Sequence, residues 1–163
     1  MKIGVISDTH IPVSAIDIPE KVREYFKGCD LIIHAGDIVE GSVLKKLGKI
    51  AETRAVCGNM DSAELRQILP DKLLLDVEGK KVGVTHGSGP HFKVMESARK
   101  SFKNKPDVII FGHSHGPVNE MRDGTLFFNP GSATDRVFAK YRSFGIIEIN
   151  GDDIRGEIIR IDD

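Results

Sequence analysis

The sequence is poor in cysteine and has no surplus of charge of either sign. Its two cysteines, Cys29 and Cys57, lie far apart and form no Cys-x-x-Cys pair, which excludes a thiol redox motif or a zinc ribbon of that spacing. We therefore expect two reduced core thiols. With 23 Lys and Arg against 24 Asp and Glu, the formal charge is −1, without the basic surplus of a protein that binds an extended nucleic-acid backbone. Any phosphate chemistry is then expected at a local site.

Long apolar segments are also lacking. The N-terminal apolar run meets the charged Asp8 too early for a signal peptide, and no stretch approaches the ~20 residues that span a bilayer. We therefore expect a cytoplasmic protein with no membrane partner. No repeat, low-complexity tract or flexible linker divides the 163 residues, so we expect a single domain over 1–163. A homo-oligomer remains compatible with this sequence.

The first half alternates short apolar runs with helix-like stretches, a pattern typical of βαβ units and a parallel sheet. The first expected helix has a proline in its first turn, and Gly28 marks its end. The pattern predicts strands over 2–8, 31–37 and 53–59, and helices over 19–27, 42–49 and 62–68.

The second half reads mostly as β-structure. Two apolar runs flank Glu78-Gly79-Lys80 and predict a hairpin over 72–87, followed by a helix over 91–103 and a strand over 107–113. Turns at 122–124 and 150–152 predict further antiparallel pairs. We expect an α/β fold: a four-layer αββα sandwich, in which two mixed β-sheets pack face to face with helices outside.

Polar side chains gather where the expected strands end, at the edge where α/β sheets bind ligands. They comprise two Asp, one Asn and four His: Asp8, His10, Asp37, Asn59, His86, His113 and His115. Imidazole and carboxylate without thiolate favour Mn, Fe, Ni, Co or Zn over Ca or Mg. Seven ligands exceed the needs of one ion, whereas two ions about 3.5–4 Å apart that share a carboxylate would use them all.

Five short motifs carry a resemblance that covers nearly the whole chain. In order and spacing, they resemble the motifs of the calcineurin-like metallophosphoesterases: Asp8-Thr9-His10, Gly36-Asp37, Gly58 to Asp61, His86-Gly87, and Gly112 to His115. The small size, the Ile-Ile-His-Ala-Gly-Asp form of the second motif, and Asn-Pro-Gly-Ser at 129–132 are most similar to the compact phosphodiesterases of the YfcE type.

The resemblance implies a site with two divalent transition-metal ions. It implies a first ion held by Asp8, His10 and His115, a second held by Asn59, His86 and His113, and Asp37 bridging both. In such enzymes a metal-bridging hydroxide attacks the phosphorus of a small phosphodiester. Asn59 and Asp37 are thereby also catalytic, because the Asn59 NH₂ group is able to donate to a phosphoryl oxygen while its amide oxygen binds metal.

Two alternatives to a phosphodiesterase stay open at this point. The same site would serve a phosphomonoesterase or nucleotide phosphatase, and the fold would also serve as a non-catalytic binding scaffold. A eukaryotic relative of this type acts as a subunit of a trafficking complex and has a degraded metal site. In this chain every position of the ligand set is filled, which favours the enzyme.

The chain departs from larger relatives at two positions. Met60 stands where they have a histidine that assists the leaving group, and methionine has no proton to donate. Ser88 stands where relatives commonly have a further histidine, so either His91 replaces it from the glycine-rich loop or one metal is held less tightly.

Four other polar positions have weaker assignments. Strand alternation points His34 away from Asp37, which favours a buried or supporting histidine over a ligand. Asp61 either orients a neighbouring ligand or caps the following helix, and its position favours the cap. Arg136 is a candidate phosphate contact. Asn129 and the following glycine either present backbone to the phosphate or form a plain turn.

Overall fold

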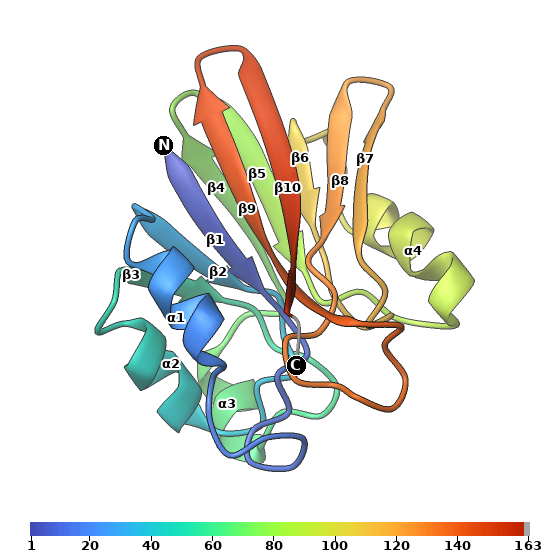
Figure 1. Ribbon diagram of the computed structural model, residues 1–163. Coiled ribbons are helices and arrows are strands. Elements are labelled where there is room, and N and C mark those ends of the chain that lie inside the picture. Colours follow the sequence, from blue (N-terminus) through green and yellow to red (C-terminus); the bar gives the residue numbers. More distant parts are fainter. Residues whose placement is uncertain (162–163) are drawn as a thin grey trace.

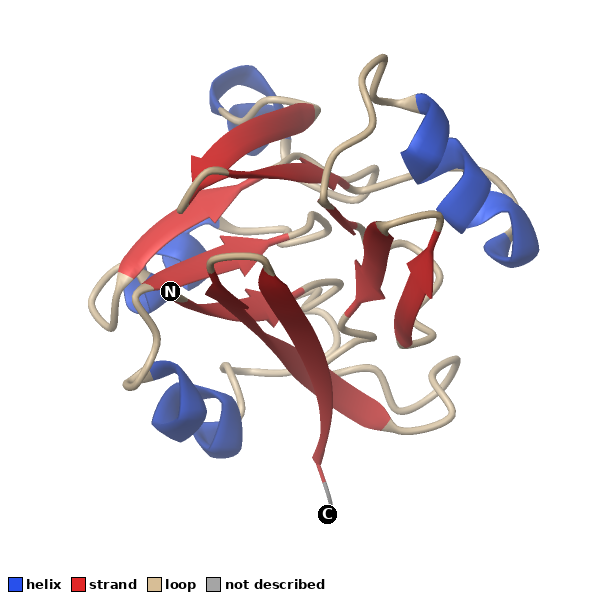
Figure 2. Ribbon diagram, turned by 90° about the horizontal axis from the view of Figure 1, so that it is seen from above, coloured by secondary structure: helices blue, strands red, loops and turns tan. Residues whose placement is uncertain are grey.

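The computed structural model describes residues 1–161, which form two mixed five-stranded β-sheets with helices on their outer faces (Figures 1 and 2). In the first sheet, β1, β2 and β3 are parallel, and β9 and β10 form an antiparallel hairpin on the other side of β1. The order across this sheet is β10 (Asp153–Ile161), β9 (Arg142–Asn150), β1 (Lys2–Ile6), β2 (Leu31–His34) and β3 (Glu52–Ala55).

The second sheet combines two hairpins around a parallel centre. Strand β5 pairs in parallel with β6, and β6 with β8, while β4 and β7 are antiparallel edge strands. The order is β4 (Lys72–Val77), β5 (Lys80–Thr85), β6 (Val108–Ile110), β8 (Thr125–Asn129) and β7 (Val118–Arg122).

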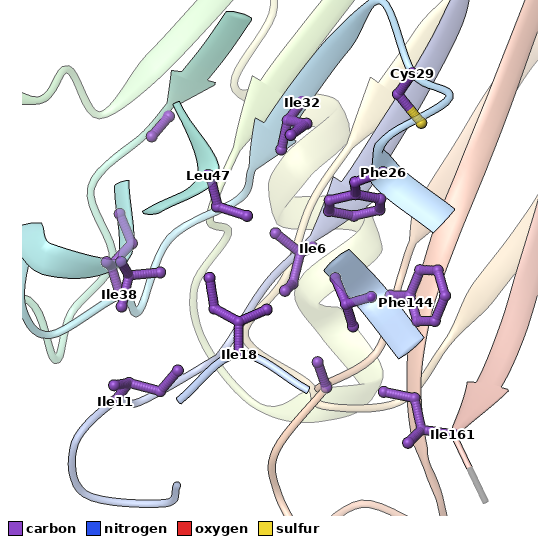
Figure 3. Packing of buried hydrophobic residues seen from close by; sticks show 14 of the residues in the cluster. Ile6, Ile11, Ile18, Phe26, Cys29, Ile32, Ile38, Leu47, Phe144 and Ile161 are labelled. Carbon is purple, nitrogen blue, oxygen red and sulfur yellow. The ribbon is translucent and has the colours of Figure 1, made fainter. Parts of the chain in front are cut away.

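The layers follow from the alternation of side chains along the strands. On β1, Ile3 and Val5 belong to the core between the sheets, whereas Ile6 belongs to the core beneath the helices. In that helix-side core, Phe26 and Phe144 meet edge to face, with ring centroids 5.6 Å apart (Figure 3). Helices α1 (Glu20–Phe26), α2 (Gly41–Leu47) and α3 (Ala63–Ile68) flank the first sheet, and α4 (Val94–Lys100) flanks the second.

This arrangement confirms the predicted αββα sandwich, with differences in detail. The predicted helix over 91–103 is a 3₁₀ turn, His91–Lys93, followed by α4, and Phe102 turns inward to pack against the core under α4. The strand predicted over 107–113 is only β6, because the chain leaves the sheet toward the polar loop at Gly112. The helices of residues 1–161 include none with the length and apolar character needed to cross a membrane.

Candidate metal centre

The predicted ligands lie on the loops that follow five strands, and these loops meet at one edge of the sandwich. The five strands are β1, β2, β3, β5 and β6. Asp8 and His10 follow β1, and His115 follows β6. Their ligand atoms converge: His115 Nε2 lies 3.3 Å from Asp8 Oδ1 and 3.4 Å from His10 Nε2. These three side chains form one group able to hold a metal ion.

A second group adjoins the first. Asp37, which follows β2, places Oδ2 3.4 Å from His86 Nε2 and 3.5 Å from His10 Nε2, so one carboxylate oxygen faces a histidine of each group. The Asn59 Oδ1 atom lies 3.1 Å from His86 Nε2 and 3.0 Å from His113 Nδ1. The seven residues Asp8, His10, Asp37, Asn59, His86, His113 and His115 are called the ligand cluster below.

The spacing of these atoms fits metal coordination. Two ligands at about 2.1 Å from one ion, separated by 90–110°, lie roughly 3.0–3.4 Å apart. The contacts described above fall close to this range. The approach of His10 Nε2 to His115 Nε2 supports the same interpretation, because two imidazole nitrogens that face each other are expected to have a cation between them. Asp8 is also grouped with Asp37 and His86, so its carboxylate is close to both groups.

Two histidines of the ligand cluster have one ring nitrogen fixed by a backbone carbonyl. The Nδ1 atom of His86 lies 2.8 Å from the Ala35 carbonyl oxygen, and Nε2 of His113 lies 3.0 Å from that of Gly89. A carbonyl only accepts, so each of these nitrogens carries the proton and the opposite nitrogen is free to bind a metal. The chain thus presets the tautomer that coordination needs.

The backbone of the ligand cluster is unusual. Five of its residues have φ in the left-handed region that favours glycine: Asp8 at 52°, His10 at 43°, Asp37 at 56°, His113 at 67° and His115 at 54°. Such conformations cost of order 1–3 kcal/mol each and gather at functional sites, where the surrounding structure enforces them. The local strain therefore coincides with the proposed chemistry.

Glycines before the ligands allow this close approach. A Cβ atom on Gly58 would collide with the backbone nitrogen and carboxylate of Asp37, and one on Gly112 would collide with Ser7 Oγ and the Asp8 carboxylate. The Gly-Asn and Gly-His pairs of the motifs are thus steric requirements: only glycine lets these loops touch the buried carboxylates.

Electrostatics couples the carboxylates and imidazoles of the ligand cluster. Burial raises the pKa of Asp8, but its hydrogen bond with His115 and the nearby charge of His86 outweigh burial and lower the pKa overall. Burial likewise lowers the pKa of His86 and His115, yet the facing carboxylates raise both to about 9. Buried carboxylates that stabilise the positive charge of neighbouring imidazoles this strongly are also suited to attract a divalent cation.

Asp61 supports the ligand cluster and does not cap α3, so the predicted cap is wrong. The Ser62 hydroxyl is the cap, accepting from the Leu65 N–H at 3.3 Å. The Asp61 carboxylate is buried and accepts from three backbone N–H groups, those of Ile38 (2.5 Å), Val39 (2.7 Å) and Gly58 (2.7 Å). It ties the loop after Asp37 to the loop that carries Asn59.

Asp135 is a supporting residue that the sequence reasoning missed. Its Oδ2 atom lies 2.5 Å from His115 Nδ1, which directs His115 Nε2 toward Asp8. The signal was present in the chain, since Asp135 closes the segment that begins with Asn129-Pro130-Gly131-Ser132. The Ser132 hydroxyl donates to the Asp8 carbonyl at 2.7 Å, so this segment buttresses the first motif.

Asn129 forms the predicted turn, because its Oδ1 atom accepts from the Gly131 N–H at 2.9 Å, and it also has a bracing role that was not predicted. Its NH₂ group donates to the Gly112 carbonyl at 2.9 Å and contacts Ser114 Oγ at 3.0 Å. It therefore holds the loop of His113 and His115 in place.

The remaining candidates lie outside the ligand cluster. His34 is fully buried, with Nε2 3.0 Å from Thr9 Oγ1, and burial lowers its pKa to about 4, as expected of a neutral core histidine. His91 is exposed on the 3₁₀ turn. Arg136 is exposed after Asp135 and lines a separate surface cavity of about 420 Å³ with Arg142.

Comparison with known proteins agrees with the fold and the ligand cluster. Residues 1–152 match the calcineurin-like phosphoesterase superfamily domain. The chain therefore belongs to the calcineurin-like phosphoesterase superfamily, whose members bind divalent metals.

Individual relatives cover almost the whole chain. A probable metallophosphoesterase from Methanothermobacter thermautotrophicus is 38% identical over 162 residues, which cover 98% of this chain and 92% of that protein. The phosphodiesterase YfcE from Escherichia coli is 30% identical over 173 residues, covering 91% of this chain and 88% of its own. The structure of a novel archaeal phosphodiesterase matches with a TM-score of 0.74 and 29% identity, covering 98% of this chain and 100% of that one. Family membership and these names indicate a metallophosphoesterase, as the motifs predict.

Proposed function

We propose that the protein, as one domain over 1–163, is a metal-dependent phosphodiesterase that uses two divalent transition-metal ions. The observation that carries this proposal is the position of Asp37 Oδ2, 3.5 Å from His10 Nε2 and 3.4 Å from His86 Nε2. A single carboxylate oxygen between two groups of imidazoles is the arrangement expected of a shared ligand in a two-metal site.

The proposed ligand sets follow the two groups. Asp8, His10 and His115 hold the first ion, and Asp37 is shared with the second. The coordination of the second ion is completed by three further residues, Asn59, His86 and His113. The chemistry of these donors suits Mn, Ni, Fe, Co or Zn, because neutral imidazole nitrogen is a poor ligand for Ca and Mg.

The residues of the chain prepare the site for in-line attack on phosphorus. Bound divalent cations supply Lewis acidity, which withdraws charge from phosphoryl oxygens and makes water a stronger acid. Asp8 and Asp37 are held as carboxylates by their imidazole partners. The Asn59 amide turns its oxygen toward His86 and His113, which leaves its NH₂ group to donate to a phosphoryl oxygen of the substrate.

The leaving group determines which esters react well. Met60 follows Asn59 and is 56% exposed, and a thioether does not protonate a departing oxygen. We therefore expect small diesters with acidic leaving groups to be the best substrates. The names of the Escherichia coli and archaeal relatives support a phosphodiester over a monoester or nucleotide.

The test combines metal content with activity. Protein stripped with chelator and reloaded with Mn²⁺, Ni²⁺ or Zn²⁺ should contain close to two ions per chain and hydrolyse bis(p-nitrophenyl) phosphate faster than p-nitrophenyl phosphate. Asp37→Ala should lose both ions and the activity, whereas Asp17→Ala, at an exposed carboxylate paired with Lys46, is the matched control. Faster monoester turnover would support the phosphomonoesterase, and metal-free protein without activity would support the scaffold.

A further inference from the structure

A polar cavity of about 350 Å³ opens beside the ligand cluster on the side of Asn59 and His86. Its walls include two residues of the ligand cluster, one arginine and several hydroxyls: Asn59, His86, Arg66, Thr85, Ser97 and Ser101. A substrate phosphate held at the ligand cluster would direct one of its ester substituents into this space. The cavity therefore bears on which diester the site accepts.

Arg66 is fixed at this cavity by the same turn that carries Asn59. Its Nε donates to the Asp61 carbonyl at 2.9 Å, and its Nη2 donates to the Asn59 carbonyl. These bonds use two of the five guanidinium donors and leave three. No carboxylate within residues 1–161 forms an ion pair with Arg66, so its positive charge is held in place without being neutralised.

The hydroxyl wall continues the polar surface away from Arg66. Ser88 and Ser97 share a hydrogen bond of 2.9 Å between their Oγ atoms, which leaves one of the two hydroxyl protons available to a ligand. Lys72 Nζ donates to the carbonyl of Ser101, a residue of the cavity wall, at 2.9 Å, which brings a second cation close to that wall. Arginine, lysine and serine hydroxyls together are the groups that proteins use to bind phosphate.

Carboxylates near the cavity are fewer than cations. Asp71 lines the cavity itself. The three serines Ser88, Ser97 and Ser101 also line an adjoining cavity of about 410 Å³, which carries Lys93, Lys100 and Glu96. Glu96 is already paired with Arg99 at 2.9 Å and with Lys100 at 3.4 Å. A ligand that leaves the ligand cluster along these serines therefore passes mainly cationic groups.

Resting on the proposed phosphodiesterase function, we propose that this cavity binds a second phosphate group, carried by the ester substituent that remains on the scissile phosphate. Arg66 is then a specificity-determining residue: it recognises the second phosphate through its free donors. The substrate class is a phosphodiester with a terminal phosphate on a short polar linker, and a simple dialkyl or diaryl diester fills the site incompletely.

The experiment compares three p-nitrophenyl diesters with the same leaving group and a different second substituent: ethyl, 2-hydroxyethyl and 2-phosphoethyl. In the metal-loaded protein, kcat/KM for the 2-phosphoethyl ester should exceed that for the ethyl ester by roughly 10-fold, the size expected of one charge-assisted hydrogen bond. In Arg66→Gln the ratio should fall to about 1, and in Arg66→Lys it should be intermediate. Arg23→Gln, at an exposed arginine of α1 that is 3.6 Å from Asp17, should keep the parent ratio.

A ratio is used because a purely structural role of Arg66 would lower both rates together and leave their ratio unchanged. An unchanged ratio in Arg66→Gln, or equal rates for all three esters in the parent protein, overturns the assignment while the phosphodiesterase function stands. Complete absence of diester hydrolysis overturns the function. Calorimetric titration then tests phosphate binding in the cavity without any hydrolysis. Ethane-1,2-diol bisphosphate should bind roughly 10-fold tighter than ethyl phosphate in the parent protein, and the two should bind equally in Arg66→Gln. Equal affinity in the parent protein overturns the inference.

Discussion

Replacing Asp135 by asparagine should weaken metal binding at the first group without removing any ligand. In the native protein, Asp135 Oδ1 accepts from the N–H groups of Val137 (2.8 Å) and Phe138 (3.1 Å). Asp135 Oδ2 accepts from Ala139 N–H at 3.1 Å and from His115 Nδ1 at 2.5 Å. The carboxylate thus serves four donors with two oxygens.

Asparagine offers only one oxygen. The backbone N–H groups of Val137 and Phe138 both donate to that oxygen, so the NH₂ group must face His115 Nδ1 and the N–H of Ala139. Nδ1 of His115 then has to accept, which moves the imidazole proton to Nε2, the atom that points at Asp8. A nitrogen that carries a proton does not bind metal, and loss of such a supporting contact typically costs 10–100-fold in metal affinity.

The assay is a calorimetric titration of chelator-stripped protein with Mn²⁺ or Zn²⁺. Asp135→Asn should retain one tight site and bind the other ion about 10–100-fold more weakly. Asp17→Asn, at an exposed carboxylate 2.9 Å from Lys46, is the control for a generic loss of negative charge. Two sites of native affinity in Asp135→Asn would show that His115 does not depend on this contact.

Three further changes test other parts of the structure. Gly58→Ala places a methyl group against Asp37 and should lower the free energy of unfolding by about 1–3 kcal/mol, whereas Gly28→Ala, whose nearest neighbour would be 3.9 Å away, should change it little; equal melting temperatures would contradict the steric argument. Burial lowers the pKa of His34 from 6.5 to about 4, so its neutral form stabilises the fold above pH 6.5 and this contribution, roughly 3 kcal/mol, is lost as the pH falls toward 4. Denaturant unfolding of metal-stripped protein should accordingly show a shallower decline over that pH range in His34→Gln, and parallel curves would refute the assignment. Met60→His restores a proton donor and should raise turnover of aryl diesters with weakly acidic phenols by at least about 10-fold, toward the ~10²–10⁴-fold typical of general acids, and an unaltered dependence of the rate on phenol acidity would speak against it.

The positions of the predicted ligands could be inferred from sequence because each one directly follows an apolar run. Parallel strands end at a common edge, so residues as distant as Asp8 and His115 are brought together by local patterns alone. Which strands pair with each other was harder to predict from the sequence. Strand β9 lies beside β1, more than a hundred residues away in the chain, with β10 on its other side, and no local signal specifies that neighbour.

Supporting residues were harder to predict than ligands. Asp61 precedes a helix, and its sequence position is equally good for a cap, but the carboxylate is drawn to the three N–H groups of two loops that only the fold brings close. Asp135 acquires its role from His115, which lies 20 residues earlier on a different loop. Such contacts depend on loop conformation, which hydrophobic periodicity does not encode.

The left-handed backbone of the ligand cluster has an evolutionary consequence. His113 occupies a conformation that glycine adopts at least as readily, so replacing it by glycine relieves strain of about 1 kcal/mol or more, while the hydrogen bond from Asn129 to Gly112 keeps the loop in place. Thermodynamic stability therefore does not protect the chemistry of this chain. A lineage in which hydrolysis ceased to matter would be free to lose His113 and keep a stable sandwich, and only selection on turnover preserves it.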